Sequence, residues 1–390
     1  MRDTAEEINV PLERQAPALF RALSPLGKRV FFASRIPGGP PSGSPVEGLP
    51  EVRERWREWQ RRSAPAGVPS SLPLVTAGLS HGLSLIADLF GGEGKAVAVP
   101  SPFWGNYRQA FAVRTGAKVL TGEAYVDGRY NPRVISDALA GLPEGEPAVA
   151  ILNIPSNPGG YSPDPAERRA TVESLLEEAG RRPLVVVCDD AYAGLVFEPD
   201  IPRESLFWEL AGAAHPNLAA VKVDGATKEF SFFGGRVGFL TFALEPESEA
   251  ARSLESKVKT LVRCTIGSPV TASQEILLHA LRTEGVEAEI EDVRRLLEGR
   301  YRSLRGALAG ADPGLMGTLP FNSGCFALVE LPEGLGLDSE TVRRHLLERH
   351  DTGLISLAPR YLRIAHCSVD EGALPELVRR MEKGIGELAT

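Results

Sequence analysis

Six short, apolar and mostly β-branched runs separated by longer amphipathic segments occupy residues 72–224, and this alternation constrains the fold most. Runs with so few polar residues are typical of strands that are buried on both faces. Strand–helix alternation predicts a mainly parallel central sheet covered by helices on both sides, which is a three-layer α/β fold. The predicted strands are 72–77, 95–100, 117–122, 147–153, 183–189 and 218–224, and helices are predicted at 83–90 and 167–180.

The regions on either side of this alternation have a different texture. "SRIPGGPPSGSPVEGLP" (34–50) is too rich in Pro, Gly and Ser for regular structure, and "EVRERWREWQRR" (51–62) after it reads as a charged helix. From about residue 285 a long charged helix is followed by shorter strands and helices. We therefore predict an N-terminal strap (1–47), a large domain (48–285) and a small α+β domain (286–390).

Composition excludes several classes of function. The net charge of -8, from 43 basic and 51 acidic residues, argues against nonspecific nucleic-acid binding. No apolar run approaches the roughly 20 residues that span a bilayer, and the acidic N-terminus does not resemble a secretory signal. The four cysteines form no CxxC pair, which predicts buried, reduced thiols and no metal site. The chain is expected to be soluble, cytoplasmic and free of membrane or nucleic-acid partners.

Ligands of such sheets bind beyond the carboxyl ends of the strands, so the loops there are the candidate site. "GLSHG" (78–82) opens a helix, where the free N–H groups of residues such as Leu79 and the Ser80 hydroxyl suit a phosphate; a tight strand–helix connection is the competing explanation. Trp104 in "SPFWGNY" (101–107) is either a cover for a planar ligand or a core aromatic. Asn157 in "IPSNPGGYSP" (154–163) is either a rigidly held amide or part of a surface turn.

The last two loops carry charge. Asp189 closes an almost wholly apolar strand, and its burial requires a cationic partner such as a protonated heterocyclic nitrogen; Tyr192 follows three residues later. Lys228 lies among small and aromatic residues, where it is either a solvated loop charge or an amine held for covalent chemistry. Arg236 could grip a phosphate with two hydrogen bonds. Taken as a set, the five loops fit pyridoxal 5'-phosphate.

With these motifs the chain resembles the fold-type I, pyridoxal-phosphate-dependent aminotransferases of class I/II, the aspartate aminotransferase superfamily, from about residue 45 onward. "NIPSNPGG", "CDDAY" and "TKEFSFFGGRVGF" are similar to three of its motifs. The resemblance implies that Lys228 binds the cofactor's aldehyde and moves the substrate's Cα proton. It implies that Asp189 keeps the ring nitrogen protonated and that Asn157 and Tyr192 bind the ring hydroxyl. Trp104 would stack on the ring.

The same resemblance implies contacts to phosphate and substrate. Leu79, Ser80 and Arg236 would hold the phosphate. Arg363 in "YLRIAHC" (361–367) would clamp the substrate's α-carboxylate, with Arg360 as the weaker alternative. Arg263 in "LVRCTIGSP" (261–269) matches an arginine that crosses the dimer to a side-chain carboxylate, although a structural arginine is nearly as good an explanation. "PFWGNY" (102–107) also resembles the loop of aspartate- and aromatic-specific members, so dicarboxylic or aromatic amino acids are the expected donors.

Three positions depart from the family pattern. Gly225, three residues before Lys228, stands where many members have a phosphate-binding serine, and Thr227 is the candidate to compensate. The asparagine loop reads Pro-Gly-Gly rather than Pro-Thr-Gly. Gly43 stands near the place of a tyrosine that reaches the neighbouring subunit's phosphate.

The resemblance implies a homodimer with shared active sites, whose substrates are an amino acid and a 2-oxo acid. Two alternatives stay open. One is a β-lyase or decarboxylase that uses the same site, and the other is a non-catalytic pyridoxal-phosphate-binding sensor or degenerate member. No basic helix-turn-helix precedes the core, which argues against the sensor.

Overall fold

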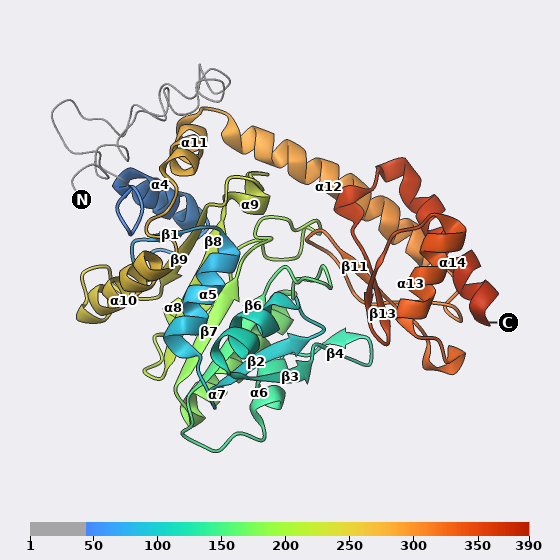
Figure 1. Cartoon of the computed structure of the whole chain (residues 1–390), viewed down its shortest axis with the longest axis horizontal. Helices are drawn as coiled ribbons and strands as arrows, with labels where there is room; N and C mark the ends of the chain where they lie inside the picture. The colour runs from blue at the N-terminus through green and yellow to red at the C-terminus, as the bar shows by residue number, and fades with distance from the viewer. Residues whose placement is uncertain (1–43, 390) are drawn as a thin grey trace, which may run out of the picture.

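The computed structural model describes residues 44–389, so Gly43 and most of the predicted strap lie outside the described residues. A seven-stranded sheet in the order β1-β9-β8-β7-β6-β2-β3 forms the centre of the larger part of the molecule (Figure 1). Its strands are β1 (Leu74–Thr76), β2 (Ala96–Ser101), β3 (Lys118–Glu123), β6 (Ala148–Asn153), β7 (Leu184–Asp189), β8 (Leu218–Gly225) and β9 (Gly238–Phe242).

The sheet is mainly parallel, as predicted, and contains all six predicted strands. The strand that the sequence analysis missed is β9, which runs antiparallel to both β8 and β1. Its first three residues lie in "GRVGFL" (235–240), which the sequence analysis interpreted as part of a phosphate-binding motif and not as a strand. Because β9 separates β1 from β8, the loops after β1 and β8 converge on the start of β9.

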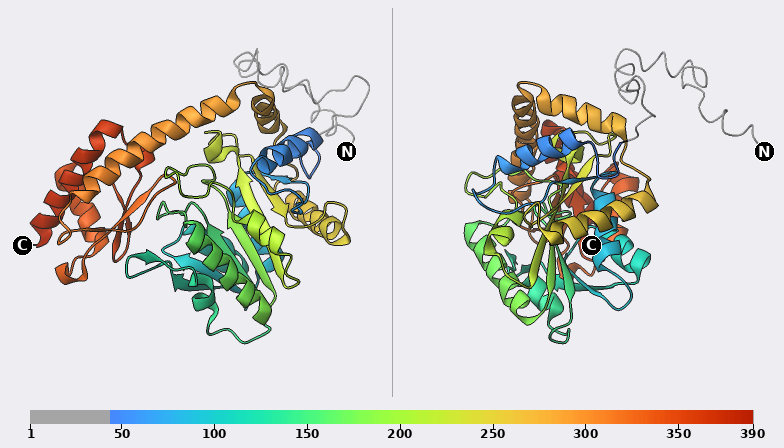
Figure 2. Two further views of the ribbon diagram at one scale, coloured as in Figure 1. Left: turned by 180° about the vertical axis from the view of Figure 1, so that it is seen from behind. Right: turned by 90° about the vertical axis from the view of Figure 1, so that its left-hand side faces the viewer.

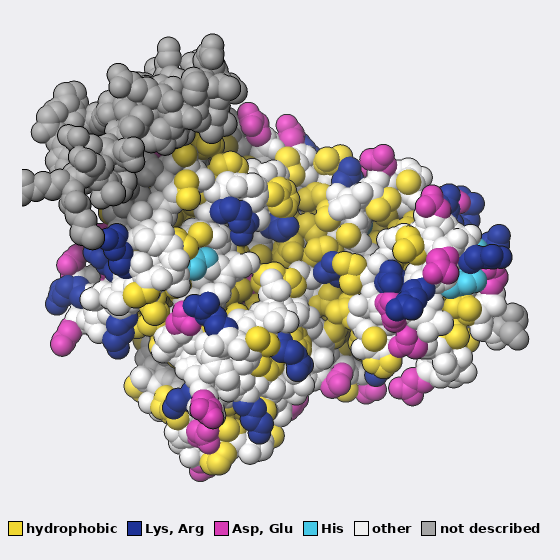
Figure 3. Space-filling model, in the orientation of Figure 1, with side chains coloured by type: hydrophobic (Ala, Val, Ile, Leu, Met, Phe, Trp, Pro, Cys, Tyr) yellow, Lys and Arg dark blue, Asp and Glu magenta, His cyan; other side chains and the backbone are white. Residues whose placement is uncertain are grey.

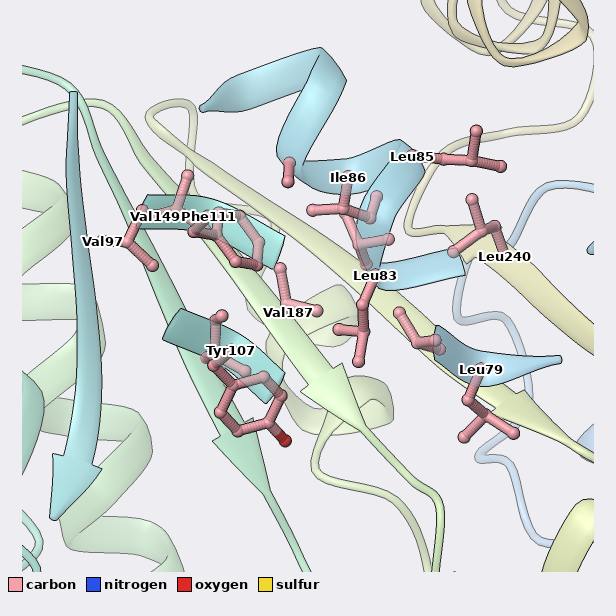
Figure 4. Close-up of a cluster of buried hydrophobic side chains, with 14 of the residues drawn as sticks. Leu79, Leu83, Leu85, Ile86, Val97, Tyr107, Phe111, Val149, Val187 and Leu240 are labelled. Carbon is pink, nitrogen blue, oxygen red and sulfur yellow. The ribbon is translucent and has the colours of Figure 1, made fainter. Parts of the chain in front are cut away.

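Alternating residues of the strands face two helical layers. Val187 of β7 packs with α5 (Leu79–Phe90), the π-helical turn Arg108–Val113 and α10 (Glu249–Thr265), and Figure 4 shows part of this cluster. Val186 and Cys188 face the opposite way, toward α6 (Val134–Leu139), α7 (Pro165–Arg181) and α8 (Phe207–Ala213). This period-two division of apolar side chains produces the three-layer architecture.

Local sequence sets the ends of the predicted helices. Asp164 caps α7 in a reciprocal capping box with Glu167, and Pro165 occupies the first helical position, where a missing N–H costs nothing. The predicted helix after the strap is α4 (Pro50–Arg61), which packs beside α11 (Thr271–Arg282). Its Trp56 stacks on Phe239 of β9 with ring centroids 4.4 Å apart.

A second, four-stranded antiparallel sheet forms the smaller part of the molecule (Figure 2). Its order is β10 (Gly317–Thr318), β11 (Ala327–Glu330), β13 (Tyr361–Ile364) and β12 (Ile355–Leu357). Helices α12 (Val286–Ala309), α13 (Ser339–His350) and α14 (Leu374–Ala389) pack with this sheet around one apolar core. The content matches the expected α+β unit, while the domain boundaries themselves stay a prediction. Among residues 44–389, no helix is long and apolar enough to cross a bilayer.

Candidate active site

The carboxyl ends of β6, β7 and β8 meet at one edge of the large sheet, close to the small sheet. Asn153 and Asp189 are register partners at the ends of β6 and β7, and the Asn153 amide donates to the Asp189 carbonyl at 2.8 Å. The loop after β6 also contacts the small sheet's segment, because the amides of Asn322 and Ser323 both donate to Gly160 O. Figure 3 shows hydrophobic side chains gathered in the middle of this face, between the two parts.

Asp189 is buried, and its carboxylate accepts hydrogen bonds from the Tyr107 hydroxyl (2.5 Å) and the Ala191 amide (3.1 Å). Burial raises the pKa of Asp189 to about 6, and the Tyr107 hydrogen bond opposes that rise. Figure 4 shows the Tyr107 hydroxyl turned away from the apolar cluster, in the direction in which the strands end. A buried acid of this kind gains most from a cationic ligand group beside it.

Tyr107 was not among the predicted site residues. It lies three positions after Trp104, and at helical spacing two such residues are neighbours, which is the signal that could have found it. Its phenol is fully buried and stays protonated, because burial and the Asp189 charge raise the pKa of Tyr107. Tyr107 therefore acts as a fixed donor to the carboxylate.

Asn157 links two other predicted residues. Its amide nitrogen donates to the Tyr192 hydroxyl at 3.3 Å, and its amide oxygen accepts from Arg363 Nη1 at 3.0 Å. The Asn157 backbone amide is fixed in turn by Asn153 Oδ1 at 2.6 Å. The competing explanation of a plain surface turn is therefore wrong for Asn157, whose side chain joins β7's loop to β13.

Arg363 lies on β13 with its guanidinium 4.3 Å from the centroid of the Phe326 ring. Its Nε is buried without a hydrogen-bond partner among the described residues, and burial lowers the pKa of Arg363. Arg360, the alternative candidate, is instead paired with Glu330 at the surface. Of the two arginines, only Arg363 combines burial with uncommitted donors.

Lys228 lies in the short helix α9 (Ala226–Glu229) that follows β8. Its Nζ is 4.3 Å from the centroid of the Phe233 ring and 5.8 Å from that of the Tyr192 ring. The side chain is half-buried, so the alternative of a solvated loop charge does not describe it. Lys228, Tyr192, Asn157 and Arg363 thus form one group of neighbours.

Two cysteines also meet near Lys228. The interaction with Cys325 lowers the pKa of Cys367, and the positive charge of Lys228 acts in the same direction. Sequence reasoning missed the pair because its members, Cys325 and Cys367, are 42 positions apart in the chain. The expectation of four buried thiols is wrong for Cys264, which is exposed, and for Cys367, which is half-buried.

The N-terminus of α5 and Arg236 form a concave group of donors. Gly78 caps α5 with φ 81° and has no side chain to satisfy the first helical amides, those of Leu79 and Ser80. A Cβ on Gly78 would lie 2.5 Å from Arg236 Nη2, so the guanidinium packs directly against this glycine. Arg236 itself has φ 53°, a left-handed conformation that costs a non-glycine residue roughly 1–3 kcal/mol.

Trp104 lies beside this group. Its indole is half-buried, packs edge-on to Tyr107 with ring centroids 5.7 Å apart, and lines a cavity of about 320 Å³ together with Ser80. A larger hollow of about 560 Å³ lies at the opposite ends of the strands, around Pro147 and Pro183. That hollow holds none of the predicted site residues.

Close backbone packing explains why position 225 is a glycine. A Cβ there would lie 2.6 Å from Val237 O and 2.7 Å from Gly238 Cα, because the end of β8 is pressed against β9. The serine of related chains would collide with this backbone. Next to it, Thr227 Oγ1 is buried without a hydrogen-bond partner among the described residues. Thr227 therefore offers an uncommitted hydroxyl near the position that the serine would occupy.

Arg263 does not join the group in this chain. It is an exposed residue in the last turn of α10, at the far side of the large sheet from β13 (Figure 1). The nearby Thr265 hydroxyl lies 2.9 Å from His81 Nε2, at the start of α5.

These residues fit pyridoxal 5'-phosphate. The uncapped α5 and Arg236 provide phosphate donors, and Thr227 Oγ1 and Arg363 Nε are buried polar atoms that lack partners within residues 44–389. Asp189 supplies a buried acid and Lys228 an amine.

Comparison with known proteins gives a consistent result. Residues 42–381 match the family model described as aminotransferase class I and II. The chain is 29% identical over 354 residues to the 2-aminoadipate transaminase of Thermus thermophilus, covering 88% of this chain and 81% of that protein. It is 25% identical to the arginine–pyruvate transaminase AruH of Pseudomonas aeruginosa over 80% of this chain and 72% of the relative.

Solved structures share the fold. An aminotransferase from Anaerococcus prevotii superposes with a TM-score of 0.75 at 22% identity, covering 91% of this chain and 85% of that one. The α-aminoadipate aminotransferase LysN of Thermus thermophilus, in complex with N-(5'-phosphopyridoxyl)-L-leucine, gives a TM-score of 0.73 at 24% identity over 97% and 89% of the two chains. With the family model spanning most of its length, the chain belongs to the class I and II aminotransferases and is a pyridoxal-phosphate-dependent, fold-type I enzyme that transfers amino groups.

Proposed function

We propose that the group around Lys228 is the catalytic site and that it exchanges an amino group between an L-amino acid and a 2-oxo acid. When bound, pyridoxal 5'-phosphate supplies an electron sink and an aldehyde that carries the amino group. Lys228 binds that aldehyde and afterwards moves the proton from the substrate's Cα. The Phe233 and Tyr192 rings lie beside its amine.

Asp189 holds the proton on the cofactor's ring nitrogen. Burial raises the pKa of Asp189 to about 6 in the cofactor-free protein, because desolvation disfavours its ionised form. A cationic ring nitrogen beside the carboxylate offsets this desolvation cost. Tyr107 positions the carboxylate by donating to one of its oxygens. Trp104 covers the ring, and Tyr192 with Asn157 binds the ring hydroxyl.

Leu79, Ser80, Thr227 and Arg236 bind the phosphate in this proposal. The helix dipole of α5 and the Arg236 guanidinium both favour a dianion at this place. The left-handed backbone of Arg236 supports a functional role, because strained residues of this kind persist mostly at functional sites.

The uncommitted Nε of Arg363 carries the proposal for substrate binding. The guanidinium is half-buried, held by Asn157 and aligned on Phe326, so a carboxylate can form two parallel hydrogen bonds with it. This geometry suits the α-carboxylate that amino acids and 2-oxo acids share. A single clamp therefore serves both half-reactions.

For the substrate side chain we propose a dicarboxylic acid, with an aromatic amino acid as the second candidate. Relatives named 2-aminoadipate transaminase and aspartate aminotransferase are consistent with an acidic side chain. Arg263, which is exposed in the last turn of α10, would bind that carboxylate across a homodimer. The exposed Ile266 and Val270, close to it in sequence, support a buried interface there. The cytoplasm is the proposed compartment.

A donor and acceptor screen on the purified holoenzyme tests the function. An acidic donor should bleach the visible absorbance of the lysine-bound cofactor and release the matching 2-oxo acid, and 2-oxoglutarate should restore the absorbance. Ammonia release or carbon dioxide release in place of exchange would favour the β-lyase or decarboxylase alternative. A yellow protein that no donor bleaches would support the sensor alternative.

Two variants test the assigned residues. Lys228→Ala should lose the covalent adduct and at least roughly 10²–10⁴-fold in kcat, the usual contribution of a positioned proton-transfer group. Arg263→Ala should raise KM for acidic donors and leave aromatic donors unchanged. Full activity of Arg263→Ala with aspartate and 2-aminoadipate would remove the dicarboxylate argument.

A further inference from the structure

Three potential metal ligands converge on the outer side of the small sheet, where α13 packs against α14. His345 Nε2 and His350 Nε2 lie 2.9 and 2.8 Å from the same oxygen, Glu387 Oε2. The ring centroids of His345 and His350 are 5.4 Å apart, and the three ligand atoms all lie within 4.8 Å of one another. It is the one such group found among residues 44–389.

The helices approach closely at this place. A Cβ on Gly384, one turn before Glu387, would lie 2.5 Å from Leu346 Cδ2 and 3.0 Å from His350 Cδ2. Leu346 is fully buried one turn before His350, so it anchors the helix face from which the His350 imidazole projects. This close contact between α13 and α14, which share the apolar core of the small sheet, fixes the spacing of the three ligands.

The donor set matches one class of ion. Two imidazole nitrogens and a carboxylate oxygen suit zinc and similar transition metals, and three protein ligands leave a fourth position open. Metal–ligand bonds of about 2.0–2.1 Å in a tetrahedron place ligand atoms about 3.3 Å apart, so the observed distances need to widen by about 0.5 Å. The side chain of Glu387 is 42% exposed, so the carboxylate forms the solvent side of the group.

We propose that His345, His350 and Glu387 bind one divalent transition-metal ion of the zinc class, which joins α13 to α14. The His350 side chain is only 7% exposed and forms the inner wall, whereas His345 and Glu387 open to solvent and admit the ion and a water ligand. Figure 3 shows a histidine beside acidic and basic side chains on this part of the surface. The site lies apart from Lys228, so its effect is on the stability of the small sheet's unit.

The test is a Zn²⁺ titration of the chelator-treated holoenzyme by calorimetry, with thermal unfolding as the second readout. Wild type should bind one equivalent, and saturating Zn²⁺ should raise its Tm by a few degrees, roughly as mass action on the folded state requires. His345→Gln and Glu387→Gln should each weaken binding at least about 10-fold and lose the Tm increase. Both replacements are at partly exposed side chains, so the variants should fold.

His279→Gln is the matched control, since His279 is an exposed histidine on α11 and belongs to no such cluster within the described residues. It should bind Zn²⁺ as wild type does. Absence of saturable binding in wild type would overturn the proposal. So would binding that survives unchanged in Glu387→Gln, because the ion would then occupy other ligands, such as the Cys325–Cys367 pair.

Discussion

Replacing Tyr107 with Phe should change the pH range in which the apoenzyme binds pyridoxal phosphate. The variant removes one short hydrogen bond to the buried Asp189 carboxylate and leaves the aromatic packing in place. A hydrogen bond to a charged group is worth roughly 1.5–3 kcal/mol. Its loss lowers the ratio of ionised to protonated Asp189 at any given pH by roughly 10- to 100-fold.

The sign of the effect follows from the direction of the pKa. In the cofactor-free wild type the pKa of Asp189 is raised to about 6, so the carboxylate is ionised above pH 6 and increasingly protonated below it. Cofactor affinity should therefore fall as the pH drops through about 6. In Tyr107→Phe the same fall should begin about one to two pH units higher, and affinity at pH 7 should already be reduced.

The assay measures the affinity of the apoenzyme for pyridoxal phosphate by absorbance titration. The titrations cover roughly pH 5 to 8.5, a range that brackets the pKa of Asp189. Tyr130→Phe is the matched control, because Tyr130 is a half-buried tyrosine whose hydroxyl contacts Thr171 instead of a carboxylate. Its pH dependence should equal that of wild type. A Tyr107→Phe profile that coincides with wild type would refute the view that Tyr107 keeps Asp189 ionised.

Three further outcomes follow from the geometry. Gly225→Ser should lower the free energy of unfolding by roughly 1–3 kcal/mol in urea titrations, because its Cβ meets the β9 backbone, and a stable variant would contradict this. Arg236→Lys should weaken binding of pyridoxal phosphate roughly 10- to 100-fold by equilibrium dialysis, since two-pronged phosphate contact is lost; unchanged affinity would place the phosphate elsewhere. Arg363→Lys should lower kcat/KM roughly 30- to 4,000-fold, which corresponds to a loss of about 2–5 kcal/mol of transition-state stabilisation. In the same steady-state assay, kcat/KM of Arg360→Lys should stay within about twofold of the wild-type value. Equal effects of the two replacements would sink the assignment of the clamp.

Local sequence determined a large part of this site. The apolar runs fixed where the parallel strands lie, and the carboxyl ends of parallel strands necessarily share one edge of the sheet. Asn157, Asp189 and Lys228 could therefore be predicted to meet from their positions at strand ends. Glycine at position 78 likewise signals a helix start that leaves amides free.

Contacts between segments distant in the chain were decided only by tertiary packing. The spacing of the sequence gives no reason for Tyr107 to reach Asp189, or for Cys325 to reach Cys367, because helix and strand periodicities relate only near neighbours. The choice between Arg360 and Arg363 depended on which side chain the small sheet buries against Phe326.

Hydrophobic periodicity in the sequence thus predicted the three-layer α/β fold. The resemblance of its loop motifs to a known family predicted the pyridoxal phosphate chemistry and the side chains that we propose carry it. Tertiary structure decided why Gly225 must be a glycine and how α13 and α14 bring together His345, His350 and Glu387. The physical reason is that steric exclusion and ligand convergence depend on distances across the fold, and side-chain spacing along the chain does not specify those distances.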